Sequence, residues 1–270
     1  MLRGLGWIVA ATSVVALTSS VPDAPAVAAV RARPTTLVVA QMNLCNSGFA
    51  VKTCYRFGRS IGEAVGRIHR YRPDVVTLQE ICEDDLLGRD GWGPLAQAMA
   101  DIYGNGHVSV EFVPAVDRYT GDWYRCTDKA RYGTGLVYHG RGGDQHHGWY
   151  GSQDRSDEMR AWGCATVVPG RVTACTTHLS THPDVALRQC RELMALLVAA
   201  PWVMPDVMVG ADLNLGPRDA QSCLPAGFAR TGDGTLQHVV FRGGPAPPAS
   251  GTEPMRYTDH PLLYARLTLR

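Results

Sequence analysis

The segment Val207-Met208-Val209-Gly210-Ala211-Asp212-Leu213-Asn214 joins an apolar run to two polar side chains that follow it directly. The run from Val207 to Gly210 is short and apolar, which is typical of a buried strand. Asp212 and Asn214 would then stand at the carboxyl end of that strand, where a rigid element can position functional side chains. On its own the pattern is weak, because an Asn after a strand is commonly a turn residue.

The same pattern recurs in four other parts of the chain, each time with polar residues at one end of an apolar strand. These residues are Asn43 after strand 36–42, Gln79 and Glu80 after strand 74–78, His178 at the end of strand 171–178, and Asp259 and His260 before strand 262–269. Each taken alone has an ordinary structural explanation. Their recurrence at strand ends predicts that they meet in one functional site.

The residue types in this set indicate a reaction class. A carboxylate at Glu80 and an amide at Asn43 suit a hard divalent cation such as Mg²⁺. Two histidines and two aspartates suit phosphate chemistry, as donors to phosphoryl oxygens and as acceptors of a proton from water. The chain has no P-loop, GxSxG, HExxH or Rossmann GxGxxG motif. The set therefore favours metal-assisted hydrolysis.

Five short motifs in this order resemble those of the endonuclease/exonuclease/phosphatase superfamily, which has the deoxyribonuclease I-like fold. The motifs are Ala40-Gln41-Met42-Asn43, Val76-Thr77-Leu78-Gln79-Glu80, Thr177-His178-Leu179, Gly210-Ala211-Asp212-Leu213-Asn214 and Thr258-Asp259-His260. The resemblance spans about residues 36–270. It implies an α/β fold, a four-layer sandwich of two packed mixed β-sheets flanked by helices, with the site at the strand ends.

The resemblance also implies roles for individual residues. Glu80 is expected to bind the catalytic Mg²⁺ with Asn43 alongside, and Mn²⁺ or Ca²⁺ are alternative ions. Asp212 is expected to orient or deprotonate the attacking water, with Asn214 holding the phosphate. These roles agree with the physics of phosphoryl transfer, which needs charge neutralisation and an aligned water more than covalent chemistry.

His178 and His260 are expected, by the same resemblance, to donate hydrogen bonds to the non-bridging phosphate oxygens, with Asp259 as a carboxylate at or near the metal. The sequence departs from the family pattern at Gln237, where members usually carry an Asp that hydrogen-bonds the last His. An amide can orient the ring of His260, but it cannot stabilise an imidazolium as a carboxylate can. We therefore expect reduced or pH-shifted activity.

The remaining pattern predicts three amphipathic helices, over residues 59–72, 94–103 and 184–200. Residues 140–156 and 243–254 are rich in Gly, Pro or polar residues and are predicted to be surface loops. Arg131, Arg160 and Arg188 are candidates for contacts with phosphate, but a surface or structural salt bridge is the expected role of each.

The eight cysteines occur in even number in a chain with an export signal, which indicates disulfides. In a hairpin turning at Pro169-Gly170, Cys164 lies directly opposite Cys175, within disulfide reach. Proximity along the chain suggests three further pairs, which are Cys45–Cys54, Cys82–Cys126 and Cys190–Cys223. A zinc site is the alternative, but the chain has no CxxC motif.

Residues 1–28 have the features of a signal peptide. An apolar run from Trp7 to Leu17 follows a positive charge at Arg3, and Ala26-Val27-Ala28 fits a cleavage site. We therefore expect a secreted protein with one catalytic domain over residues 29–270. No apolar run is long enough to cross a membrane, so stable membrane insertion is not expected.

The net charge of +1 excludes a protein that binds nucleic acid through bulk positive charge, although a local basic patch is compatible with it. The favoured function is a secreted metal-dependent phosphodiesterase, most of all a non-specific endonuclease, because nothing in the sequence is suited to reading base edges. The alternatives are a sphingomyelinase-type phospholipid phosphodiesterase and a catalytically silent binding domain. A monomer is expected.

Overall fold

A computed structural model describes residues 36–88, 91–167, 171–244 and 249–269 of the chain. The expected signal peptide over residues 1–28 and the turn at Pro169-Gly170 lie outside the described residues. The described residues belong to one compact unit.

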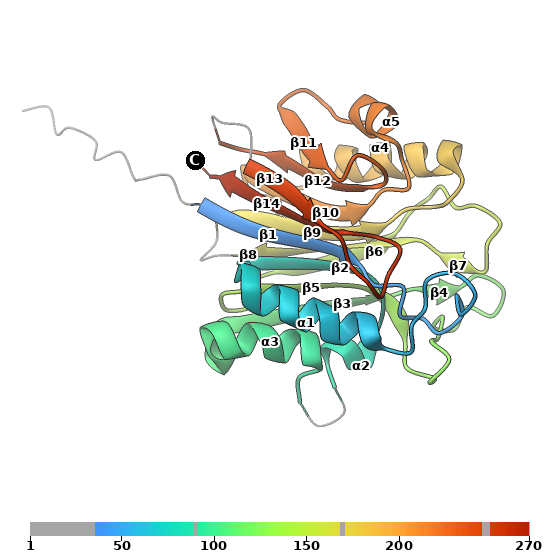
Figure 1. The fold of residues 1–270 in the computed structure, drawn as a ribbon. Helices are drawn as coiled ribbons and strands as arrows, with labels where there is room; N and C mark the ends of the chain where they lie inside the picture. Colours follow the sequence, from blue (N-terminus) through green and yellow to red (C-terminus); the bar gives the residue numbers. More distant parts are fainter. Residues whose placement is uncertain (1–35, 89–90, 168–170, 245–248, 270) are drawn as a thin grey trace, which may run out of the picture. The chain divides into compact units, whose positions relative to one another are not determined.

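Two six-stranded sheets make up most of this unit (Figure 1). The first contains, in spatial order, β13 (Ala249–Glu253), β14 (Leu262–Thr268), β1 (Thr36–Asn43), β2 (Val75–Cys82), β5 (Tyr132–His139) and β3 (Val108–Pro114). The second contains β11 (Phe228–Gly232), β12 (Gln237–Arg242), β10 (Asp206–Asp212), β9 (Val172–His178), β8 (Ala161–Val167) and β6 (Gln145–Trp149). A short pair joins β4 (Val116–Asp117) to β7 (Glu158–Met159). Both large sheets are mixed, because β1 and β2 are parallel, as are β9 and β10, whereas the other neighbours are antiparallel.

Helices cover the outer face of each sheet. The first sheet is covered by α1 (Arg59–Tyr71) and α3 (Pro94–Tyr103), with the short α2 (Glu83–Leu86) and the 3₁₀ turn η1 (Asn105–His107) nearby. The second is covered by α4 (Pro183–Ala199) and α5 (Pro217–Ser222). The predicted four-layer sandwich is therefore confirmed, and the three predicted helices begin and end within one residue of the observed ones.

The two sheets bury a shared apolar layer between their inner faces. Leu37, Val39 and Leu136 of the first sheet and Ala174 and Met208 of the second are all fully buried in it. At Gly210 on β10 the sheets approach so closely that a Cβ atom would lie 2.0 Å from the hydroxyl oxygen of Thr77 on β2. Glycine at this position allows the carboxyl ends of the central strands to come together.

The two predicted loops contain strands, which corrects the sequence analysis. β6 lies within residues 140–156 and pairs with β8, and β13 lies within 243–254 and pairs with β14. Both are edge strands of their sheets, and their side chains are only partly buried. An edge strand needs few apolar residues, so its composition resembles that of a loop.

All eight cysteines lie in the described part of the chain and form four disulfides. The pairs are those expected, namely Cys45–Cys54, Cys82–Cys126, Cys164–Cys175 and Cys190–Cys223. The register of β8 and β9 places Cys164 opposite Cys175, as the hairpin argument predicts.

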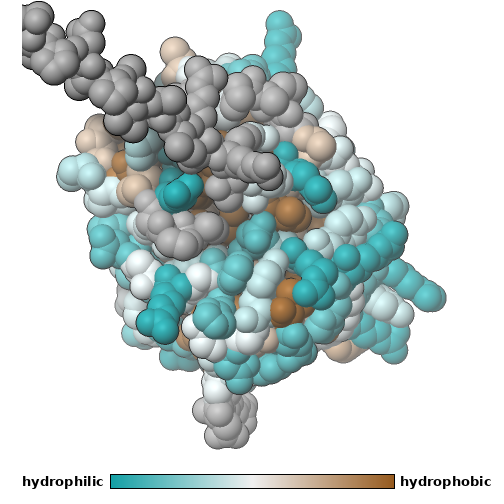
Figure 2. Space-filling model, turned by 90° about the vertical axis from the view of Figure 1, so that its left-hand side faces the viewer, coloured by the Kyte–Doolittle hydropathy of each residue, from teal (hydrophilic) through white to brown (hydrophobic). Residues whose placement is uncertain are grey.

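Figure 2 shows the end of the sheets where β1 begins and β14 ends. Hydrophobic residues form small separate patches there among hydrophilic ones. Among the described residues, no helix is both long and apolar enough to cross a membrane.

Glu111 on β3 is an acidic side chain buried away from the strand ends. It is 4% exposed, and neither carboxylate oxygen has a hydrogen-bond partner within the described residues. The exposed side chain of His147 lies nearby, with its Nδ1 4.0 Å from Glu111 Oε1. Burial raises the pKa of Glu111 to about 8. The folded protein therefore retains a proton that the unfolded chain releases near pH 4.5, and stability decreases as the pH rises from there to about 8.

The substitution Glu111→Gln is expected to raise the free energy of unfolding at pH 8.5 by roughly 2–4 kcal/mol, with little change at pH 4, because it removes the cost of ionising a buried carboxyl. Urea unfolding at the two pH values measures this difference. The exposed substitution Asp101→Asn is the control and should change neither value. An equal effect of Glu111→Gln at both pH values would contradict the prediction.

Candidate active site

The predicted site residues meet where the two parallel strand pairs end. On the first sheet, Asn43 at the end of β1 lies opposite Gln79 of β2, and on the second, Asp212 at the end of β10 lies opposite His178 of β9. The loops after β1 and before β14 come together at this end, with β4 and β7 nearby (Figure 1). The hydroxyl of Thr258 in the loop before β14 donates to the Asn43 carbonyl at 2.9 Å.

Asp212 occupies the centre of the site. Its Oδ2 accepts a hydrogen bond from Asn43 Nδ2 at 3.0 Å and lies 3.5 Å from His260 Nε2 and 3.9 Å from His178 Nε2. Its Oδ1 accepts from the backbone N–H of Asn214 at 3.0 Å. Burial raises the pKa of the Asp212 carboxyl, and the nearby His260 and the hydrogen bond from Asn43 oppose that rise. One carboxylate therefore contacts or faces four of the predicted residues.

Glu80 is joined to Asp212 through the side chain of Asn43. The same Asn43 Nδ2 donates to Glu80 Oε1 at 2.9 Å. Burial raises the pKa of Glu80, and the negative charge of Asp212 adds to the rise although the Asn43 hydrogen bond opposes it. Two carboxylates thus lie close together where each is costly to ionise. A bound divalent cation would remove that cost, so this donor set fits a metal ion.

The backbone around Glu80 and Asn214 is held in an uncommon conformation. Glu80 has a φ of 54° at an irregularity in the pairing of β2 with β5, and Asn214 has a φ of 50°. The Asn214 side chain donates to the Leu179 carbonyl at 2.8 Å, which joins the loop after β10 to the loop after β9. Non-glycine residues with positive φ are costly, and such residues concentrate at functional sites.

The two histidines differ in their surroundings. His178 is 6% exposed, and its Nδ1 has no hydrogen-bond partner within the described part of the chain. Burial, followed by the charges of Arg160 and His260, lowers the pKa of His178 well below its usual value. His178 is therefore neutral at physiological pH and donates through one ring nitrogen. His260 lies beside the more exposed Asp259, with 3.8 Å between Nε2 and Oδ1.

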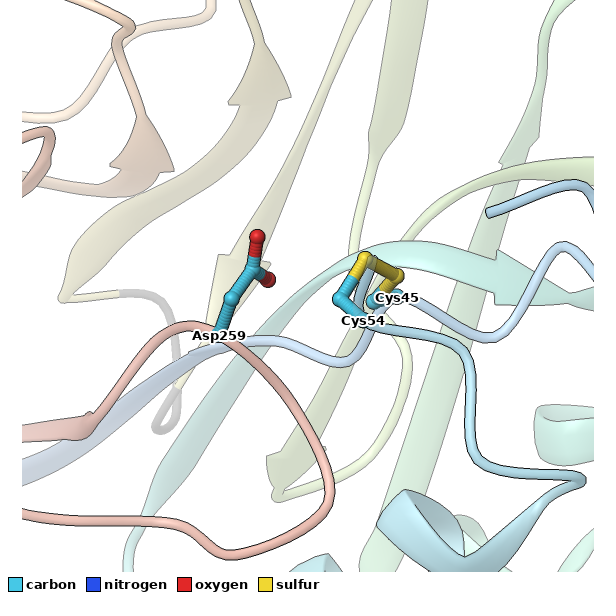
Figure 3. Close-up of side chains that lie close together, drawn as sticks. All are labelled: Cys45, Cys54 and Asp259. Atoms are coloured by element: carbon cyan, nitrogen blue, oxygen red, sulfur yellow. A yellow bond between two sulfur atoms is a disulfide. The ribbon is translucent and has the colours of Figure 1, made fainter. Parts of the chain in front are cut away.

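Asp259 lies next to the disulfide that closes the loop after β1 (Figure 3). The carboxylate of Asp259 approaches the Cys45–Cys54 sulfur pair from the loop before β14. Both sulfur atoms are bonded to each other, so they do not serve as metal ligands. The disulfide therefore has a structural role at this edge of the site, where it closes the loop beside Asp259.

The position of Gln237 corrects the expectation that its amide holds the His260 ring. Its Oε1 accepts from Gln41 Nε2 and from the Asn43 backbone N–H, both at 3.1 Å, and its Nε2 donates to the Pro261 carbonyl at 2.7 Å. The fully buried Gln237 side chain therefore links the end of β1 to the residue after His260. This bridge needs both a donor and an acceptor, which an amide has and a carboxylate lacks.

Arg160 and Glu158 form a buried charged pair whose charges act on the site, and the sequence analysis singled out Arg160 but not Glu158. The expected structural salt bridge of Arg160 is present, with Nη1 3.1 Å from Glu158 Oε1, but Arg160 is 6% exposed. Its positive charge opposes the burial effect on the pKa values of Glu80 and Asp212. Burial raises the pKa of Glu158 to about 7 despite the arginine. Neither residue ends a long apolar strand, so the pattern that located the other residues does not mark this pair.

Comparisons with known proteins agree with the fold described above. Residues 58–260 match the model of the Endonuclease/Exonuclease/phosphatase family. Three solved structures share the fold at low sequence identity. D. rerio TDP2 in complex with a single-strand DNA product has a TM-score of 0.59 and 15% identity, and the match covers 86% of this chain and 98% of the other. ANGEL2, a 2',3'-cyclic phosphatase, has a TM-score of 0.60 and 11% identity, with coverage of 87% of this chain and 96% of the other. An endonuclease/exonuclease/phosphatase from Beutenbergia cavernae has a TM-score of 0.59 and 18% identity, with coverage of 87% of this chain and 72% of the other. No curated protein matches the chain.

Proposed function

The chain belongs to the endonuclease/exonuclease/phosphatase family, whose members are hydrolases acting on phosphodiester bonds, and from this we propose that it is a secreted, metal-dependent phosphodiesterase that acts as a non-specific endonuclease. The observation that carries the proposal is the joined set of Asp212, Asn43 and Glu80, with two histidines facing Asp212. The TDP2 complex with single-strand DNA supports nucleic acid as the substrate class. The four disulfides suit an extracellular protein.

Glu80 would hold the metal ion, with Asn43 alongside, and Mg²⁺ is the ion that we propose, with Mn²⁺ or Ca²⁺ as substitutes. When bound, the ion supplies positive charge to the phosphate and to the buried carboxylates. Arg160 adds a fixed positive charge that favours ionised Glu80 and Asp212. Arg160 thus offsets part of the cost of ionising these two buried carboxylates, and a bound ion would offset more of it.

Asp212 would orient the attacking water and accept its proton, because its Oδ2 lies at the centre of the donor set. The neutral His178 and the ring of His260 would donate hydrogen bonds to the non-bridging phosphate oxygens, whose charge is stabilised in the transition state. Asn214 would hold the phosphate with the amide hydrogen that Leu179 does not use. Asp259 would lie at the edge of the metal site.

One observation favours phospholipid as a second candidate substrate. The segment around the Cys45–Cys54 disulfide exposes Phe49, Val51 and Phe57, and the disulfide places it beside Asp259. Exposed aromatic and aliphatic side chains next to a site suit contact with a lipid surface. A sphingomyelinase-type activity is therefore the alternative to the nuclease activity. A silent binding domain is weaker, because the catalytic residue types are in mutual contact.

Nicking of supercoiled plasmid by the disulfide-intact mature chain tests the proposal. We expect nicking with Mg²⁺ that is lost in EDTA and in the Glu80→Ala variant, because both remove the ion or its ligand. The exposed substitution Asp101→Asn should leave nicking intact. Hydrolysis of sphingomyelin without nicking would replace the nuclease proposal by the lipid one, and no hydrolysis of plasmid, sphingomyelin or bis(p-nitrophenyl) phosphate would establish a silent domain.

A further inference from the structure

A cavity of about 320 Å³ adjoins the candidate active site. It lies between the start of α1, the Cys82–Cys126 disulfide and the loop after Cys126. The backbone N–H of Asn46, which lines the cavity, donates to the Glu80 carbonyl at 2.7 Å. A residue that lines the cavity is thus hydrogen-bonded to the backbone of the proposed metal ligand. Its volume is at the lower end of the range for small-molecule sites.

The inner wall of the cavity contains a buried acceptor that lacks a partner. Asn46 Nδ2 donates to Asp85 Oδ2 at 2.9 Å, and the same oxygen accepts from the Cys82 backbone N–H at 2.8 Å. This arrangement orients the Asn46 amide and leaves its Oδ1 without a hydrogen bond within the described residues, in a side chain that is 9% exposed. A buried acceptor in this condition favours a ligand that brings an N–H donor.

The other polar groups of the cavity are also mainly acceptors. Asp85 and Asp128 contribute carboxylates, and none of the described residues that line the cavity is basic. Burial raises the pKa of Asp85 to about 6, so a donor placed against it would offset the cost of its charge. The lining therefore selects for a hydrogen-bond donor or a positively charged group and against an anion.

Two aromatic rings line the same cavity. Tyr55 and Phe57 lie with their ring centroids 5.3 Å apart, and Phe57 is 74% exposed. An exposed aromatic ring beside a polar pocket can stack on a flat ligand or contact an ammonium group. The rings and the acceptors together are complementary to a ligand that has an apolar or planar part and an amino group.

We propose that this cavity is a specificity pocket for the amino group of a substituent on the phosphodiester substrate, which donates to Asn46 Oδ1 and Asp85 while the substituent packs against Tyr55 and Phe57. The proposal rests on the proposed phosphodiesterase function and replaces cleavage without any preference by a preference for substrates that carry such a substituent. The amino group could belong to a nucleobase or to an ethanolamine head group, and both have N–H donors. Choline and uracil lack an amino group, so the pocket should discriminate against them.

The test compares p-nitrophenyl phosphodiesters of deoxycytidine and deoxyuridine, whose bases differ in the amino group at the ring edge. We expect kcat/KM to be about tenfold higher for the cytosine ester, because uracil presents a carbonyl oxygen to the Asn46 and Asp85 acceptors where cytosine presents its amino group. The ethanolamine and choline esters form the second arm and identify a lipid head group as the source of the amine. Bis(p-nitrophenyl) phosphate has no amino group and measures the phosphodiesterase activity alone.

Substitutions in the cavity test whether it causes the preference for the cytosine ester over the uracil ester. Phe57→Ala and Asp85→Asn should bring the cytosine-to-uracil ratio toward one. Phe49→Ala is the matched control, because Phe49 is also exposed on this disulfide-closed segment but does not line the cavity. It should leave the ratio unchanged.

Calorimetric titration with deoxycytidine and deoxyuridine monophosphates gives a readout that does not depend on turnover. Tighter binding of the cytosine nucleotide, lost in Phe57→Ala, would support the pocket even if the chain hydrolysed no phosphodiester. Equal kcat/KM for the cytosine and uracil esters and for the ethanolamine and choline esters, together with equal binding of the two nucleotides, would overturn the proposed pocket. Hydrolysis of bis(p-nitrophenyl) phosphate in that case would still support the proposed phosphodiesterase function.

Discussion

The substitution Asp212→Asn is expected to lower kcat for phosphodiester hydrolysis by about 10²- to 10⁴-fold. The new side chain has nearly the same shape but cannot accept a proton from water. It also replaces one of the two oxygens by an NH₂ group, so the hydrogen bond from either Asn43 Nδ2 or the Asn214 N–H is lost. Rates on bis(p-nitrophenyl) phosphate at saturating Mg²⁺ measure the loss.

Stability separates this catalytic role from a structural one. Burial raises the pKa of Asp212, so stability is lost as the pH rises from the unfolded pKa of about 3.8 through the higher pKa of the folded protein. Asp212→Asn removes this cost at pH 7 but also loses a hydrogen bond, so its unfolding temperature should stay near that of the parent protein while its activity falls. Asp219→Asn, on an exposed position of α5, is the matched control and should change neither quantity. A variant at position 212 that retained more than a tenth of the activity would refute the assignment.

Removal of the Cys82–Cys126 disulfide is expected to lower the free energy of unfolding by about 4 kcal/mol. This disulfide closes a loop with a sequence separation of 44, and the chain-entropy model relates the stabilisation to the length of the closed loop. It also connects the end of β2, two residues after Glu80, to the loop beside the proposed pocket. The double substitution of both cysteines by alanine, studied by urea unfolding, measures the effect.

The Cys45–Cys54 disulfide is the matched comparison within the same chain. Its sequence separation is 9, so the same model predicts a smaller loss of about 2.5 kcal/mol for the corresponding double alanine variant. Equal losses for the two variants, or a larger loss for Cys45–Cys54, would contradict an entropic origin of the difference and would indicate that packing of the cystine side chains dominates.

The central strands and the three longest helices of this fold were predictable from the sequence, and the edge strands and the short helices α2 and α5 were not. β1, β2, β9 and β10 are buried and apolar, and α1 has a regular apolar face, so each has a strong periodic signal. β6 has the sequence Gln-His-His-Gly-Trp and gains its order from pairing with β8. Pairing of this kind depends on a partner strand and leaves little trace in the strand's own residues.

The residues of the candidate site also divide into those that the sequence predicts and those that it does not. Asn43, Glu80, His178, Asp212 and His260 were predictable, because each lies at or next to the end of an apolar strand. Their catalytic roles are still proposals. The hydrogen bonds of Gln237 to the Asn43 and Pro261 backbones were not predictable, since an amide side chain can face several neighbours and the packing of the two sheets decides which.

The sequence by itself determined what depends on alternation along a strand or on neighbours along the chain. It placed polar residues at strand ends, and the parity of the hairpin set Cys164 opposite Cys175. The tertiary structure decided what depends on distant segments. Asn43 meets Asp212 across 169 residues, and the charge of Arg160 reaches Glu80, because two sheets pack face to face and bring their strand ends together. Such contacts follow from how whole layers pack, which no local pattern of residues specifies.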